Sequence, residues 1–444
     1  MRISESEPTE AYVWIWLPGA HEPVVAGLLS TRGPNLDFTY GSSYLARDNA
    51  ISIFEPDLPL LPGTMAPRVG TIAGCITDAG PDNWGQRVIL RHRFGRQLNE
   101  IDDLSELTFL LESGSDRIGA LDFQSSPSDY VSRESDHSTL AELAEAAARL
   151  EAGEPLSPAL DRALLHGTSV GGARPKALLR DGERYLIAKF SSNTDVAPMV
   201  QWEYVAMELA RRAELNVAPV AIDRALGRDV LLVQRFDRPG KGARRSMVSA
   251  LTILGLIPMA GHHAEYHKLA FRLRSEGSAP VDDTHELFAR ISFNILVGNT
   301  DDHARNHAAF WDGTHLELTP AYDIAPQPRS GGETSQAMEI GDDHYRMSNL
   351  RGLTDRADEY LLSPAQAREI VDNQIDAIHE NWNEVCDNAR LSDLERSELM
   401  GRQFLNPYAL EDYEPRRTAP LSANIKKAPS APPPREPRGS RTNG

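Results

Sequence analysis

Alternating apolar and polar residues predict short strands in the first part of the chain. Residues 11–16 (Ala-Tyr-Val-Trp-Ile-Trp) and 36–40 (Leu-Asp-Phe-Thr-Tyr) show this alternation, which is typical of half-buried strands. Frequent Gly and Pro residues separate such segments up to about residue 130. This region is therefore expected to be rich in short strands and turns.

The spacing changes to a helical one near residue 139. Thr139 and Glu142 form a capping-box pattern, and the Leu- and Ala-rich run that follows ends before Gly153, so a helix is predicted over 139–152. Residues 153–160 have the composition of a linker. Strands are then predicted at 185–190 and 229–234 with a helix at 200–213 between them.

Helices dominate the predictions for the second half of the chain. One covers 284–297 and stops at Gly298, and another begins with Ser363 as N-cap and Pro364 in its first turn. The buried stripe of the second helix is expected to be Val371, Ile375, Ile378, Trp382 and Val385.

Strands followed by helices indicate an α+β protein. We expect the bilobal plan of a protein kinase, with a mixed, β-rich N-terminal lobe and an all-helical C-terminal lobe. The predicted units are a β-rich N-terminal subdomain (1–135), an ATP-binding part of the N-lobe (136–238), a helical C-lobe (239–411) and a disordered, Pro-rich tail (412–444).

Composition narrows the class of protein. The 444 residues are 41% apolar and carry a net charge of −18, which argues against broad nucleic-acid binding by this chain alone. The two cysteines, Cys75 and Cys386, are expected to be small buried residues. With no apolar leader and no membrane-length apolar run, a cytoplasmic protein without a membrane partner is expected.

The loop after Gly298 carries the most specific chemical pattern, Asn-Thr-Asp-Asp-His-Ala-Arg-Asn at 299–306. Phosphoryl transfer uses a carboxylate to accept the proton of the attacking hydroxyl, and kinases place a metal-binding Asn five positions later. Asp301 has that interval to Asn306, whereas Asp302 is one residue short, so Asp301 is the predicted base. A helix-capping acidic loop is the alternative interpretation.

A second carboxylate follows at the expected distance along the chain. In the segment Leu-Thr-Pro-Ala-Tyr-Asp-Ile-Ala (318–325), a strand-like stretch ends at Asp323, where a kinase would place its second metal ligand. Asn306 and Asp323 would together offer hard oxygen ligands to Mg²⁺. An Asp at the end of a strand in an ordinary turn is the alternative.

Two basic positions precede these motifs. Residues 167–179 form a glycine-rich turn in which Arg174 and Lys176 add positive charge, although a flexible surface loop would look similar. Lys189 lies in an apolar strand, where burial is costly unless its ammonium meets an anion. ATP phosphates would be such an anion, and Glu203 is the nearest helix carboxylate; a snorkelling lysine is the alternative.

The segment 232–238 (Leu-Val-Gln-Arg-Phe-Asp-Arg) is the expected hinge between the lobes. Its backbone would pair with adenine and Asp237 would meet the ribose. An ordinary strand end with salt-bridging Arg and Asp side chains remains open as the alternative.

Taken in order, these segments resemble the HipA family of serine/threonine kinase toxins. The resemblance rests on 167–176, 187–190, 234–238, 299–306 and 322–325, with 78–85 (Asp-Ala-Gly-Pro-Asp-Asn-Trp-Gly) similar to the N-terminal region of the family. It implies ATP and Mg²⁺ as cofactors, Asp301 as base, and Asn306 and Asp323 as metal ligands. The implied nucleotide-binding residues are Gly171, Gly172, Ala173, Arg174, Pro175, Lys176, Lys189, Gln234, Arg235, Phe236, Asp237, His303, Arg305, Asn306, Tyr322 and Asp323.

The resemblance also implies regulation and partners. Ser169 matches a serine that the family autophosphorylates, and a phosphate there would bring about −1.5 to −2 charges into a loop that cradles ATP phosphates. The implied partners are a helix-turn-helix antitoxin (HipB-like), operator DNA held through it, and a protein substrate such as an aminoacyl-tRNA synthetase. A small-molecule kinase and a catalytically silent, antitoxin-bound co-repressor are the competing hypotheses.

Overall fold

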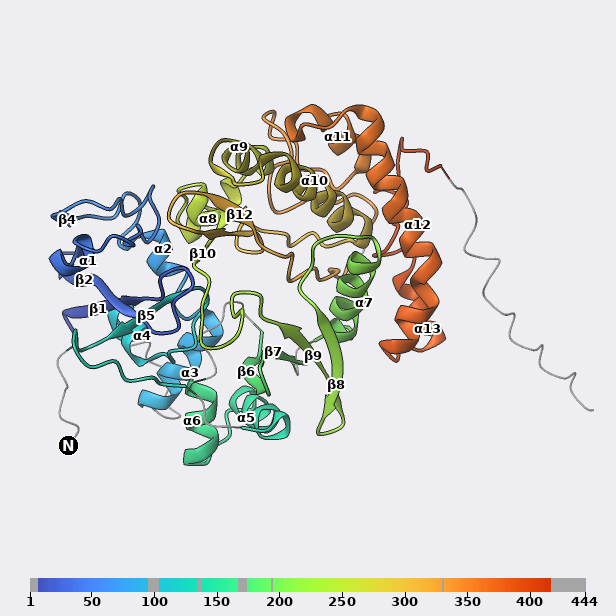
Figure 1. Cartoon of the computed structure of the whole chain (residues 1–444). Helices are drawn as coiled ribbons and strands as arrows, with labels where there is room; N and C mark the ends of the chain where they lie inside the picture. The colour runs from blue at the N-terminus through green and yellow to red at the C-terminus, as the bar shows by residue number, and fades with distance from the viewer. Residues whose placement is uncertain are drawn as a thin grey trace, which may run out of the picture.

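The structure is a computed structural model. It describes residues 7–94, 104–134, 138–166, 174–192, 195–329 and 331–416. The N-terminal subdomain lies beside both lobes of the remaining chain, and the C-terminal helices form the opposite end of the molecule (Figure 1). Among the described residues, none of the helices combines the length and the apolar character that crossing a membrane requires.

The N-terminal subdomain is built on a five-stranded antiparallel sheet with strand order β4-β3-β2-β1-β5. The predicted strands at 11–16 and 36–40 correspond to β1 and β3, and their buried faces include Val13, Ile15 and Phe38. The strands are β1 (Glu10–Ile15), β2 (Val24–Arg32), β3 (Asn35–Tyr40), β4 (Thr64–Met65) and β5 (Leu121–Gln124). Four helices that the alternation did not reveal accompany the sheet: α1 (Ser42–Leu45), α2 (Gly74–Thr77), α3 (Asn83–Phe94) and α4 (Glu106–Glu112).

The N-lobe contains a four-stranded antiparallel sheet, order β6-β7-β9-β8. Its strands are β6 (Lys176–Asp181), β7 (Arg184–Phe190), β8 (Val220–Ala225) and β9 (Arg228–Gln234). α5 (Leu140–Glu151) and α6 (Pro158–His166) share one apolar cluster with this sheet, and α7 (Met199–Arg212) packs through a second cluster. The Thr139–Glu142 capping box is confirmed, but Pro158 already begins α6, so the predicted linker over 153–160 is too long.

The C-lobe is mainly helical, and α12 (Pro364–Asn388) runs beside α7 of the N-lobe (Figure 1). The N-cap at Ser363, Pro364 in the first turn and the predicted buried stripe of α12 are confirmed. The other helices are α8 (Ala250–Ile253), η1 (Pro258–His263), α9 (Tyr266–Glu276), α10 (Pro280–Val297), α11 (Leu350–Thr354), η2 (Ala357–Tyr360) and α13 (Asp393–Leu399).

Two expectations for this lobe need correction. It is not all helical, because β10 (Met247–Ser249), β11 (Ala308–Trp311) and β12 (Leu316–Leu318) form a three-stranded sheet; strands of three or four residues are too short for alternation to reveal. Residues 412–416 do not begin a disordered tail, since Tyr413 is buried and its hydroxyl donates to Asp372 at 3.0 Å. The remainder of the predicted tail lies outside the described residues.

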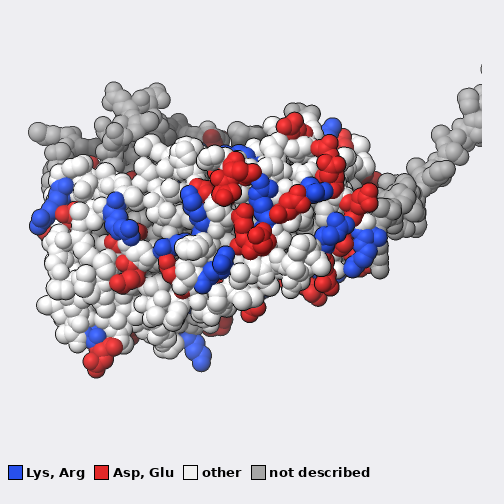
Figure 2. Space-filling model, turned by 90° about the horizontal axis from the view of Figure 1, so that it is seen from above, with Lys and Arg blue, Asp and Glu red and all other residues white. Residues whose placement is uncertain are grey.

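Charged side chains of both signs are mixed on the face of the molecule seen from above (Figure 2). A protein that binds nucleic acid broadly would gather Lys and Arg on one face instead. Cys75 and Cys386 are both buried and free, as expected.

The most deeply buried ion pair of the N-terminal subdomain joins Arg117 to Asp122. Neither side chain is exposed, and the Arg117 Nε lies 2.8 Å from Asp122 Oδ1. Asp122 also pairs with Arg133 at 3.1 Å, so removing Arg117 would not leave its charge uncompensated. We therefore expect Arg117→Leu to lower the free energy of unfolding by about 1–3 kcal/mol, the cost of lost buried hydrogen bonds, measured by urea titration.

Arg351→Leu is the matched control, since Arg351 pairs with Asp355 at 2.7 Å and the two side chains are 58% and 53% exposed. An exposed pair contributes about 0–1 kcal/mol. Equal losses of stability in the two variants would contradict the role assigned to Arg117.

Candidate active site

Lys189 lies where the two lobes meet, at the junction that is called the cleft below. In β7 the side chains of Ala188 and Phe190 point into the cluster shared with α5, so Lys189 projects from the opposite face. Its Nζ lies 2.5 Å from Glu203 Oε1 on α7 and 2.5 Å from Asp323 Oδ1. Burial disfavours the ammonium, but the carboxylates of Asp323 and Glu203 outweigh it and raise the pKa of Lys189 above its ordinary value. The predicted meeting of Lys189 with Glu203 is confirmed.

Asp323 is held in an unusual backbone conformation at the end of a short extended segment. The bridge between Val217 and Ala321 fixes this segment against the N-lobe, and Asp323 itself has φ = 60°, a left-handed conformation that Asp tolerates better than most residues. Burial opposes ionisation, yet Lys189 lowers the pKa of Asp323 to about 2. Its stabilising pair is complete above the ordinary Asp value and is lost as the pH falls toward about 2.

The loop that carries Asp301 begins where α10 ends. Gly298 closes the helix with φ = 68°, and a Cβ there would lie 2.8 Å from the Gln403 carbonyl oxygen, so a glycine is required. The next turn is fixed by Asn299, whose amide donates to Asn294 Oδ1 at 3.0 Å. The direction of the loop is thus set by backbone geometry and by one buried amide pair.

The two consecutive aspartates of this loop have different environments. Asp302 is buried, and its Oδ2 accepts hydrogen bonds from Tyr266, Asn294 and His307 at 2.6–2.9 Å. Asp301 is exposed to solvent in the cleft. Desolvation, and the nearby charges of Asp323 and Asp302, raise the pKa of Asp301, while His303 opposes the shift. A carboxylate that already accepts three hydrogen bonds is poorly placed to accept a proton from a substrate, so the geometry favours Asp301 as the base.

Asn306 lies behind Asp301 in the same loop. Its Nδ2 donates to the Asp301 carbonyl at 3.3 Å. Because the amide nitrogen is used in this hydrogen bond, the Oδ1 atom is the one left to bind a cation. His303 also donates its backbone N–H to the Asp301 carbonyl at 2.9 Å. The Asp301 carbonyl therefore accepts two hydrogen bonds, which keep Asn306 and His303 close to Asp301.

An aromatic pair lies near the expected hinge, where β9 ends. The rings of Phe236 and Tyr322 lie 5.7 Å apart, and Phe236 also packs edge-on against Phe310 at 5.8 Å. The Tyr322 hydroxyl donates to the Arg305 carbonyl at 2.7 Å. Phe236 and Tyr322 thus join the end of β9 to the loop that holds Asp301.

The expected hinge residues do not all face the cleft. Gln234 lies in register with Leu186 and so projects on the α5 side of the sheet, opposite to Lys189. Its backbone N–H already donates to the Pro219 carbonyl at 2.8 Å. Any contact of Gln234 with adenine would therefore have to use its carbonyl group.

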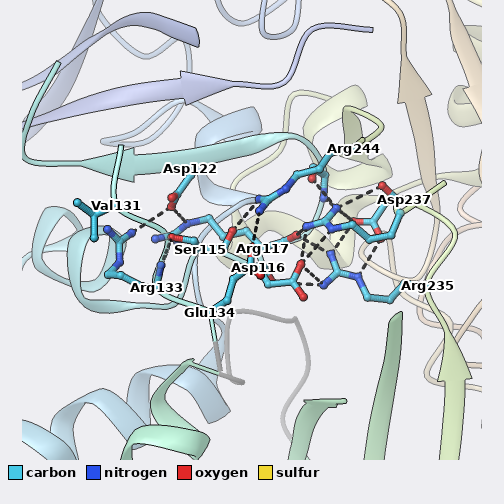
Figure 3. Close-up of polar contacts among 12 residues, drawn as sticks. Ser115, Asp116, Arg117, Asp122, Val131, Arg133, Glu134, Arg235, Asp237 and Arg244 are labelled. Atoms are coloured by element: carbon cyan, nitrogen blue, oxygen red, sulfur yellow. Dashed lines mark hydrogen bonds and ion pairs between the residues drawn. The ribbon is translucent and has the colours of Figure 1, made fainter. Parts of the chain in front are cut away.

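The prediction that Asp237 meets a ribose is wrong, because its carboxylate is buried among cations (Figure 3). It lies 2.8 Å from Arg235 and 2.9 Å from Arg238, and it accepts the Gly119 N–H at 2.8 Å. Arg235 is also buried and pairs with Asp116 at 2.9 Å. Salt-bridging Arg and Asp side chains, the alternative interpretation of this segment, are therefore what the structure shows, and they also hold the hinge to the N-terminal subdomain.

Lys176 has a partner that the sequence did not reveal. Its buried ammonium lies 3.0 Å from Asp82 of the N-terminal subdomain, and its carbonyl accepts the indole N–H of Trp84 at 3.0 Å. Burial lowers the pKa of Lys176, although Asp82 opposes this. Four residues before Asp82, Asp78 accepts the backbone N–H and the hydroxyl of Ser249, both at 2.7 Å. The segment 78–84 therefore ties the N-terminal subdomain to both lobes.

The rest of the predicted phosphate loop is only partly described. Arg174 pairs with Asp195 at 2.9 Å, and the Pro175 carbonyl accepts the Phe190 N–H at 3.0 Å. Ser169, Gly171, Gly172 and Ala173 lie outside the described residues.

Comparison with known proteins agrees with this arrangement. A family model described as the HipA-like C-terminal domain matches residues 168–382, and one described as the HipA N-terminal domain matches residues 16–124. Together they account for more than half of the chain, in the order in which the two units follow each other here. The chain belongs to the HipA family.

Individual HipA-family relatives match a smaller part of this chain than the two family models do. The putative kinase Y4mE of Sinorhizobium fredii is 31% identical over 174 residues, which is 35% of this chain and 41% of that protein. The serine/threonine-protein kinase toxin HipA of Shewanella oneidensis is 27% identical over 183 residues, 35% of this chain and 42% of that protein. The chain thus matches about two fifths of the length of these relatives.

The fold extends the likeness over most of the chain. The HipA of Shewanella oneidensis MR-1, solved in complex with HipB and its operator DNA, aligns with a TM-score of 0.64 at 20% identity. The alignment covers 90% of this chain and all of that one. The expected kinase-like α+β fold of the HipA family is confirmed.

The pair between Asp82 and Lys176 offers a test of how the N-terminal subdomain supports the site. We expect Asp82→Ala to lower the free energy of unfolding by about 3–5 kcal/mol, because it removes a carboxylate partner of a buried ammonium. Urea titration of the whole chain measures this change. Asp181→Ala is the matched control, since Asp181 pairs with Arg184 on the surface; a loss as large in the control would contradict the proposed tie.

Proposed function

We propose that this chain is an ATP-dependent serine/threonine protein kinase. The observation that carries the proposal is Lys189 held between Glu203 and Asp323, with the Asp301 loop beside them. A strand lysine paired with a helix glutamate, with a metal-binding aspartate supplied by the other lobe, is the arrangement that protein kinases use to align phosphates. The named kinase among the HipA-family relatives supports the same conclusion.

Each residue has a defined part in the proposed transfer. Lys189 would hold the ATP phosphates, and Phe236 and Tyr322 would bound the nucleotide side of the cleft. Asp301 would accept the proton of a Ser or Thr hydroxyl. The hydroxyl oxygen would attack the γ-phosphorus of ATP, and the bond between the γ-phosphorus and the departing ADP would break. Asp302 would keep Asp301 in position through its contacts with Tyr266 and His307.

The residues present fit Mg²⁺. Within the ranges that the structure describes, no group of three or more His, Cys, Asp or Glu side chains could hold a metal by itself. Mg²⁺ does not need one, because it takes one or two protein ligands and completes its shell with phosphates and water. Lys189 contacts Asp323 through Oδ1, so Oδ2 of Asp323 and Oδ1 of Asn306 are the proposed ligands. When bound, the ion would neutralise charge on the phosphates.

The likeness to the HipA family also suggests a mode of regulation and a set of partners. We propose that Ser169 is autophosphorylated and that a helix-turn-helix antitoxin binds the chain. The HipA of Shewanella oneidensis was solved with HipB and operator DNA, which supports such a partner. The net charge of −18 favours DNA contact through the antitoxin rather than through this chain. An aminoacyl-tRNA synthetase remains the proposed class of target.

Replacing the base tests the proposed activity. With Mg²⁺ and ATP, we expect mass spectrometry of the wild-type chain to show one phosphate at Ser169. Asp301→Asn should slow its appearance by about 10²–10⁴-fold, the usual contribution of a general base. Asp355→Asn, which alters an exposed carboxylate of the same lobe, should leave the rate unchanged.

The other outcomes separate the competing functions. Rapid ATP turnover on a metabolite without any phosphoprotein would indicate a small-molecule kinase. Operator binding with the antitoxin but no ATP turnover would indicate a silent co-repressor.

The pH profile tests the environment of Asp301. A base acts in its deprotonated form, so activity should be present above the pKa of Asp301 and fall as the pH drops through it. Because that pKa is raised, the loss should begin at a higher pH than for an ordinary aspartate. His303 opposes the shift, so His303→Gln should move the acid limb to still higher pH.

His315→Gln is the control, because His315 is an exposed histidine of the same lobe. An acid limb that stays in place in His303→Gln, or moves to lower pH, would contradict the assignment of Asp301.

A further inference from the structure

A cavity lined by C-lobe residues lies beside the Asp301 loop. Its volume is about 600 Å³. Thr300, His303 and Arg305 of the loop line one wall, and His262, Gln336 and Arg346 line another. Since Thr300 precedes the proposed base directly in the chain, a molecule in this cavity lies next to the place where the acceptor hydroxyl must be.

The charge of this cavity is opposite to that of the chain. The chain carries 64 Asp and Glu against 46 Lys and Arg, yet the residues that line the cavity include two Arg, two His and no carboxylate. Arg346 is anchored by Glu339 at 2.6 Å. Arg305 is exposed, and among the described residues no carboxylate lies within ion-pair distance of it. The charges of Asp78 and Glu106 reach Arg305 only at longer range.

Two buried polar atoms of the lining residues have no hydrogen-bond partner within the described part of the chain. They are Gln336 Oε1 and His303 Nδ1. Gln336 is 1% exposed, and its Nε2 donates to Ser348 at 3.0 Å, so its orientation is fixed. A buried carbonyl oxygen without a donor costs about 1–3 kcal/mol. The amide N–H of a bound polypeptide is a donor of the right kind.

We propose that this cavity binds the phosphoacceptor segment of the protein substrate and selects an acidic residue near the Ser or Thr. The carboxylate pairs with Arg305, and a backbone N–H of the segment donates to Gln336. Arginine and a carboxylate form two parallel charge-assisted hydrogen bonds, which give both affinity and orientation. The selectivity for substrate rests on the proposed kinase function, but the binding of the segment does not require catalysis.

Binding without ATP tests the cavity separately from the chemistry. The probes are fluorescent 11-residue peptides with a central Ser, flanked by Glu, Gln or Lys and otherwise identical. We expect the Glu peptide to bind at least about tenfold more tightly than the Lys peptide, with the difference shrinking as salt screens the charges. Equal affinities for the three peptides, or no binding of any, would overturn the inference.

A charge reversal assigns the selectivity to one residue. Arg305→Glu should invert the preference toward the Lys peptide, whereas Arg274→Glu, an exposed arginine of α9 outside the cavity, should keep the preference for Glu. Arg305→Glu should remain folded, because Tyr322 bonds only to the backbone carbonyl of residue 305. An unchanged preference in Arg305→Glu would exclude Arg305 as the determinant.

Phosphorylation of the same peptides separates the two proposals. Faster transfer to the Glu peptide by the wild-type chain supports both. Selective binding with no transfer to any peptide or to the chain itself would contradict the kinase function and leave the cavity as an acidic-segment site. Transfer at equal rates to all three peptides would contradict the proposed selectivity alone.

Discussion

The double ion pair of Lys189 is the interaction on which the geometry of the cleft depends. Its side chain is only 15% exposed, and its ammonium contacts carboxylates from α7 and from the segment after β12, so one charge joins three elements of two lobes. A buried cation is tolerated only when carboxylates surround it. Any opening of the lobes would separate Lys189 from Asp323, whose side chain is 40% exposed and can therefore also meet a ligand from the cleft.

The N-terminal subdomain acts on this cleft through buried charge rather than through apolar contact alone. Asp82 reaches Lys176, Asp78 reaches Ser249, and Asp116 reaches the arginines at the end of β9. Buried ion pairs contribute less to net stability than to a unique arrangement, because their desolvation offsets much of the attraction. We infer that these pairs fix the position of the subdomain, so that the strand that begins at Lys176 and the hinge cannot shift independently.

Neighbouring residues of one loop divide the chemical roles. Asp302 is buried and accepts hydrogen bonds from Tyr266, Asn294 and His307. Asp301 is exposed, and Arg305 lines the adjoining cavity. The loop thus separates a rigid side from a side that is open to substrate. Preorganisation of this kind lets one exposed carboxylate act without rearrangement of its supports.

The sequence by itself determined the local elements and the candidate chemistry. The caps at Thr139 and Ser363, the stop at Gly298 and the interval from Asp301 to Asn306 depend on residues a few positions apart, so they can be read directly from the chain. Tertiary structure decided the rest. Asp82, which pairs with Lys176, lies 94 residues away from it, and Asp116, one of the partners of Arg235, lies 119 residues away. No local pattern encodes such pairings. For the same reason, Asp237 was predicted to contact a ribose but forms buried ion pairs instead. The sequence does not specify which face of the hinge its side chain occupies, because only folding decides this.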